Sequence, residues 1–166
     1  KLAVGETVYV IEGQGLTTVW AGKGEKRTFE WQSHSMFHIP RYATYEVSNA
    51  RGNQPVRLLH YNYLPMAMTV VPDPEFFYNN PYEDPELLYG GTEDAFMSAR
   101  AVLGVGAKDP NAEAWGAQTD DSLPAASHGG AWWVGNFFPD MASWDKLSPY
   151  RGRGAGGYSV KIRFPN

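Results

Sequence analysis

Residues 34–49 have the sequence HSMFHIPRYATYEVSN, in which two short strand patterns flank a turn. The runs Met36 to Ile39 and Thr44 to Ser48 are rich in the aromatic and β-branched residues that are typical of strands. Between them, Pro40–Arg41 is a turn signal. The stretch therefore predicts two strands joined by a short connection.

Similar runs occur on both sides of this segment, separated by turn clusters that contain glycine or asparagine. In one run Phe29 and Trp31 share a face, because alternate residues of a strand point to the same side. The further predicted strands are Glu6 to Ile11, Leu16 to Trp20, Arg27 to Gln32 and Val56 to Tyr63. Short strands at this close spacing predict a mostly β protein, built as a sandwich or barrel.

The character of the sequence changes after the last of these strands. Residues 66–157 are dense in proline, asparagine and aromatic residues, and we expect a long irregular, partly helical extension or linker. A short helix is predicted near 92–103, because Thr92 suits an N-cap and apolar residues then recur on one face. The aromatic run at 132–138 is expected to be buried. Residues 158–166 alternate as a strand that enters or completes a barrel.

The composition limits the classes of function. A chain of 166 residues has room for one barrel and an appendage, and a formal charge of -4 gives no electrostatic reason to expect nucleic acid as a partner. The absence of cysteine excludes disulfides, thiolate metal sites and cysteine nucleophiles. The sequence has no signal-peptide pattern and no apolar run of membrane-spanning length, so we expect a soluble protein without a membrane partner. The compartment stays unknown, with cytoplasm as the default.

The segment 34–49 resembles the second motif of the cupin superfamily, a glycine, five residues and then P-x-G-x-x-H-x-x-x-N. Pro40 and Asn49 lie at the motif spacing. The departures are His34 and Tyr42 in place of the two glycines, and Tyr45 in place of the metal-binding histidine.

The earlier run ETVYVIEGQG resembles the end of the first cupin motif, with Glu6 at the carboxylate ligand and Gly13 at the closing glycine. The resemblance implies a cupin-type (jelly-roll) β-barrel over residues 1–65, with its N-terminal strands and H-x-H segment missing. Because the chain begins at Lys1 almost directly in a strand pattern, we expect it to be an internal piece of something longer.

Metal-binding cupins hold iron, manganese, nickel or zinc with three histidines and one carboxylate. Here Lys1 and Leu2 stand nearest the H-x-H positions and Tyr45 replaces the third histidine, so only Glu6 remains. A single carboxylate cannot hold a divalent ion against competition from water. The resemblance therefore implies a degenerate metal site and no cofactor in this chain.

Four residues are candidates for the barrel pocket: Glu6, His38, Tyr45 and His60. Tyr45 either hydrogen-bonds a substrate or fills the pocket with its ring, and the second role is the simpler one. His38 and His60 lie on predicted strands, and each could face the interior as a proton-transfer group or serve as a structural histidine.

The order of the predicted elements resembles the first half of a bicupin, loosely of the gentisate dioxygenase type. These elements are the barrel, the aromatic linker, the glycine hinge at 151–157 and a new strand. This implies a metal-free half that supports a dioxygenase-like or decarboxylase-like metalloenzyme acting on a small organic acid or aromatic. Iron or manganese would then lie in the paired barrel, and the partner would be that second cupin half or another copy, as in a dimer or other homo-oligomer.

Two other interpretations stay open. One is a non-enzymatic cupin that binds a small ligand or assembles with itself through the aromatic extension. The other is a metal-independent isomerase or lyase in which Tyr45, His38 or His60 performs acid–base work.

Overall fold

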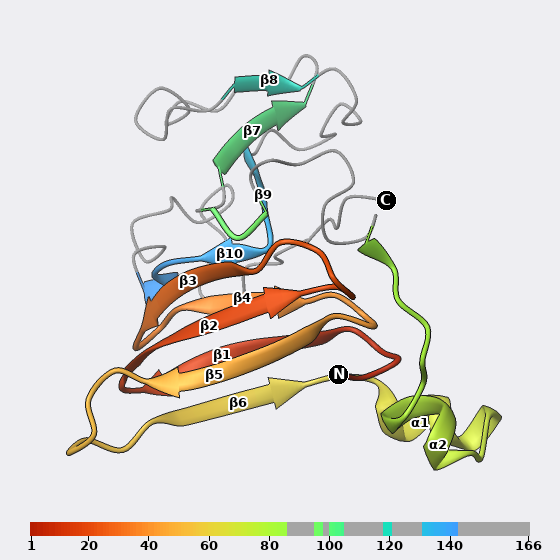
Figure 1. Cartoon of the computed structure of the whole chain (residues 1–166). Helices are drawn as coiled ribbons and strands as arrows, with labels where there is room; N and C mark the ends of the chain where they lie inside the picture. Colours follow the sequence, from red (N-terminus) through yellow and green to blue (C-terminus); the bar gives the residue numbers. More distant parts are fainter. Residues whose placement is uncertain (86–94, 98–99, 105–117, 121–130, 143–166) are drawn as a thin grey trace.

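The computed structural model describes residues 1–85, 95–97, 100–104, 118–120 and 131–142. These residues form a mostly β protein with few helices, in which two antiparallel sheets lie face to face (Figure 1). Sheet A has the order β10-β4-β1-β6 and sheet B has the order β3-β2-β5. The strands are β1 (Glu6–Glu12), β2 (Gln14–Trp20), β3 (Arg27–Gln32), β4 (Met36–Ile39), β5 (Thr44–Asn49), β6 (Arg57–Tyr61) and β10 (Phe137–Phe138).

The core lies between the two sheets, because each central strand buries every second side chain. Val8 and Val10 of β1 and Phe37 of β4 point inward from sheet A, while Val19 and Phe29 point inward from sheet B. Val10 and Val19 are both 0% exposed. The period-two pattern in the sequence therefore marks the buried face of these strands.

The six strands predicted before residue 65 are confirmed. β3 and β4 have the predicted bounds, and the others differ from prediction by at most two residues at either end. The predicted common face of Phe29 and Trp31 is also confirmed, since both side chains are buried in the core. Sheet A extends beyond the first 65 residues, however, because β10 pairs with β4.

A group of four aromatic rings packs together along the side of the sandwich formed by β3 and β10. Phe29 stacks on Phe96 with ring centroids 4.6 Å apart and also contacts Phe37 and Phe137 at 5.0 and 5.1 Å. Phe137 and Phe138 are buried, which agrees with the prediction for the end of the run 132–138. Residues far apart in the sequence thus close this side of the core.

Two short helices lie at one end of the sandwich, α1 (Leu64–Val70) and α2 (Pro74–Tyr78) (Figure 1). The local pattern at these positions is weak and predicted no helix there, and the tertiary contacts of Leu64 and Phe77 stabilise both helices. Both side chains are buried against Ala3 and Val4.

The prediction of a helix near 92–103 is wrong for the residues that the structure describes. Ala95–Met97 form a turn and bend, and Arg100–Gly104 is the strand β7. β7 pairs with β8 (Gln118–Asp120) and β9 (Ala131–Val134) in a small third sheet, and pairing with strands distant in sequence overrides a local helical pattern. The predicted strand at 158–166 and the hinge at 151–157 lie outside the described residues.

Candidate functional site

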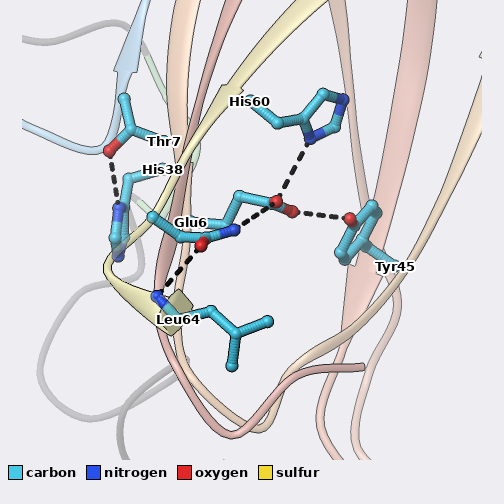
Figure 2. A network of polar contacts seen from close by, with 7 residues as sticks. Glu6, Thr7, His38, Tyr45, His60 and Leu64 are labelled. Carbon is cyan, nitrogen blue, oxygen red and sulfur yellow. Dashed lines mark hydrogen bonds and ion pairs between the residues drawn. The ribbon is translucent and has the colours of Figure 1, made fainter. Parts of the chain in front are cut away.

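The Glu6 carboxylate lies between the two sheets and is held by side chains from separate strands (Figure 2). Glu6 follows the inward phase of β1, two residues before Val8, and is only 6% exposed. The Tyr45 hydroxyl donates a hydrogen bond of 2.6 Å to Oε2, and the Asn62 amide donates one of 3.1 Å to Oε1. A buried carboxylate requires such donors, because its charge is costly to remove from water.

Strand pairing places Tyr45 and His60 on the inward faces of the two edge strands. Tyr45 of β5 is opposite Val19, and His60 of β6 is opposite Val8, so each shares the face of a buried valine. The Nδ1 atom of His60 lies 3.3 Å from Oε1 of Glu6. The structure thus brings together three of the four candidate residues.

Asn62, the fourth member of this cluster, is a residue that the sequence interpretation missed. Its Nδ2 donates to Glu6, and its Oδ1 accepts a 3.1 Å hydrogen bond from the Leu64 backbone N–H (Figure 2). The second bond spans two residues, as in an Asx turn, and leads into α1, whose N-cap residue Tyr63 makes no side-chain cap hydrogen bond. This turn could have drawn attention to Asn62, but no local pattern points from it to Glu6.

His38 does not face the interior, so the suggestion that it lies in the barrel pocket is wrong. It pairs with Thr7 and alternates with the buried Phe37 and Ile39, which puts its ring on the outer face of sheet A. There the Thr7 hydroxyl lies 3.1 Å from Nδ1 of His38. A Cβ on Gly5 would come within 2.8 Å of the same ring, so the imidazole packs directly on this glycine.

Burial lowers the pKa of His38 to about 4, against a smaller opposing effect of the Glu6 charge. His38 is therefore neutral at physiological pH. A neutral, packed imidazole with a threonine partner is a structural residue.

Burial raises the pKa of the Tyr45 phenol, and the hydrogen bond to Glu6 and the negative charge of Glu6 raise it further. The phenol therefore keeps its proton at physiological pH and acts as a donor. Tyr45 consequently joins the inner faces of sheets A and B through Glu6.

Gly13, His34 and Tyr42 are among the described residues with left-handed backbone conformations, which favour glycine. Gly13 has φ 100°, and the non-glycine residues His34 and Tyr42 have φ 71° and 62°.

Asn49 closes the turn that follows β5, because its side chain accepts from the Arg51 N–H at 2.9 Å and donates to the Gln54 carbonyl at 2.8 Å.

Within the described ranges, no group of three or more histidine, cysteine, aspartate or glutamate side chains is arranged to hold a metal ion. Among the residues that the structure describes, His60 is the further ligand of these types in contact with the Glu6 carboxylate. The remaining contacts of Glu6 come from the Tyr45 hydroxyl and the Asn62 amide, which are weaker ligands for divalent ions.

None of the helices in the described part of the chain is long and apolar enough to cross a membrane. The chain matches no family model, no curated protein and no solved structure.

Proposed function

We propose that this chain is a metal-free cupin-type (jelly-roll) barrel with a partly helical C-terminal extension, and that it supports a bicupin metalloenzyme. The hydrogen bond between Tyr45 and Glu6 carries the proposal. In the cupin motifs these two positions belong to a histidine ligand and a carboxylate ligand of the metal. Here their side chains bind each other across the two sheets, at 2.6 Å.

The backbone of the motif segment supports the cupin resemblance independently. His34 and Tyr42 stand where the second motif has its two glycines, and both have positive φ. Non-glycine residues rarely adopt this conformation, so its occurrence at both positions supports the alignment of His34 and Tyr42 with the two motif glycines. Gly13, at the closing glycine of the first motif, also has positive φ.

The chemistry of the cluster argues for a metal-free barrel. Tyr45 keeps its proton, because burial and Glu6 both raise the pKa of its phenol. Glu6 and His60 then provide one carboxylate and one imidazole, too few ligands to compete with water for a divalent ion. A filled hydrogen-bond network in place of the metal gives this barrel a structural role.

A supporting barrel needs a surface for its partner. Leu59 and Tyr61 are 55% and 73% exposed on the outer face of β6, and Met66 and Val70 are 74% and 81% exposed on α1. Exposed apolar side chains near one another are typical of contact surfaces between proteins. They suit a second cupin half, which would hold iron or manganese and act on a small organic acid or aromatic.

The metal content of the whole natural protein tests this proposal. We would compare the native protein with the Glu6→Gln and Tyr45→Phe variants by elemental analysis, with His34→Gln as an exposed control. We expect about one iron or manganese per chain in all four proteins, because the metal is held elsewhere.

Loss of metal in Glu6→Gln but not in His34→Gln would place a metal in this barrel and overturn its metal-free role. If the natural protein contains no metal, the proposal that this barrel supports a metalloenzyme is wrong. It would leave the non-enzymatic cupin, which binds a ligand or assembles with copies of itself.

A further inference from the structure

The Glu6–His60 pair has the geometry of an oriented base. Oε1 of Glu6 lies 3.3 Å from Nδ1 of His60, and a carboxylate at this position favours the tautomer with its proton on Nδ1. The opposite nitrogen, Nε2, then carries a lone pair and points away from Glu6 (Figure 2).

The support of Glu6 makes this orientation stable. Tyr45 and Asn62 hold both carboxylate oxygens, and Asn62 is itself fixed by the backbone of Leu64. The Glu6 side chain is 7% exposed whereas the His60 side chain is 37% exposed. A buried, fixed anion thus holds an imidazole that solvent can reach.

Aliphatic side chains share the inward faces of the two end strands with Tyr45 and His60. β5 and β6 are end strands of different sheets. Leu58 faces inward beside His60 and packs against the core, and Val47 faces inward from β5 yet is 36% exposed. Val47 and Leu58 are therefore the aliphatic side chains nearest along the inward faces of these strands.

We propose that His60 is a general base of a metal-independent proton-transfer site, with Glu6, Tyr45 and Asn62 as positioning residues. The substrate class is a small, uncharged carbonyl compound with an acidic C–H next to the carbonyl group. An apolar body suits Val47 and Leu58, and the Glu6 charge disfavours an anionic substrate.

The step balances without a co-reactant. Nε2 of His60 takes the proton, so the C–H bond breaks, an N–H bond forms and the electron pair moves to the carbonyl oxygen as an enolate. In a β,γ-unsaturated carbonyl compound the imidazolium then returns the proton to the γ-carbon, which moves the double bond into conjugation with the carbonyl group and restores the free base. Among the described residues, three ionisable groups lie near this imidazole. Glu6 contacts it, Tyr45 is linked to it through Glu6, and His38 lies on the opposite face of sheet A.

The probe is 5-nitrobenzisoxazole, a neutral aromatic compound whose base-promoted ring opening removes one C–H proton and releases a coloured phenolate. The native protein would be assayed with EDTA present, so that the result does not depend on a metal or on the proposal above. We expect saturable turnover at least about tenfold above free imidazole at equal concentration, since positioned bases contribute factors of about 10² to 10⁴.

His60→Gln should reduce turnover to the background, while His34→Gln, a change at an exposed histidine, should leave it unaltered. Glu6→Gln should lower kcat, expressed per folded molecule with the folded fraction measured by circular dichroism, about tenfold or more with KM unchanged. Turnover equal to free imidazole, or activity that survives in folded His60→Gln, would overturn the proposal. If Glu6→Gln does not fold, the comparison of His60→Gln with His34→Gln still decides it.

Discussion

The Tyr45 hydroxyl on β5 of sheet B donates a 2.6 Å hydrogen bond to Oε2 of Glu6 on β1 of sheet A. This bond crosses the core, and its acceptor is a carboxylate that is almost fully buried. A charged acceptor makes it stronger than a bond between neutral groups. The stability of the sandwich should therefore depend on it.

Replacement of Tyr45 by phenylalanine keeps the ring and removes the donor. We expect a loss of about 1.5–3 kcal/mol in the free energy of unfolding, because Glu6 stays buried with one donor fewer. Urea unfolding at neutral pH measures the loss. The matched control is Tyr9→Phe, which removes a hydroxyl bonded to His34 on the surface and should cost less than about 0.5 kcal/mol. Equal losses would contradict a special role for the Tyr45–Glu6 bond.

The buried His38 should make the protein less stable in mild acid. At neutral pH its imidazole is uncharged in the folded and unfolded chains, so it has no effect. As the pH falls through 6.5 the unfolded histidine binds a proton, whereas folded His38 does so only near pH 4. The free energy of unfolding should therefore decrease across this window, by up to about 3 kcal/mol.

Urea unfolding at several pH values, with NMR titration of the His38 ring, measures this effect. The His38→Gln variant should lose most of the decrease between pH 6.5 and 4. The His34→Gln variant, at an exposed histidine, should keep it. If the His38 ring titrates near 6.5 in the folded protein, burial does not lower its pKa and the prediction is wrong.

The left-handed conformation of His34 predicts an unusual response to substitution. His34→Gly should be neutral or stabilising by up to about 1 kcal/mol, because glycine adopts positive φ without strain. His34→Val should destabilise by about 1–2 kcal/mol, since a β-branched residue fits this conformation poorly. At Glu30, an exposed position inside β3, glycine should instead cost about 0.5–1 kcal/mol. Thermal unfolding of the three variants gives the order, and a destabilising His34→Gly would refute it.

Phe29 should be one of the most sensitive core positions. It contacts Phe37, Phe96 and Phe137, so Phe29→Ala removes contacts to three segments at once. We expect a loss of about 3–5 kcal/mol, measured by urea unfolding. Phe76→Ala, at a ring that is 41% exposed on α2, should cost under about half as much. Comparable losses at the two positions would argue against the aromatic group as the closure of the core.

Local sequence was sufficient for the strands up to residue 65, because each is a short run bounded by turn residues. It also contained the answer for His38, since Phe37 and Ile39 occupy the other phase of the same strand. For His60 the local pattern was ambiguous. β6 has leucine at both 58 and 59, so only its pairing with β1 decides which phase faces inward.

The sequence by itself determined the strands up to residue 65 and their turns, because these depend on residues close together along the chain. Only the tertiary structure decided which side chains surround Glu6, and that Phe96 and Phe137 close the core beside Phe29. Such contacts join residues tens of positions apart, and no local pattern encodes them. They form because burying the apolar faces of both sheets brings those residues together.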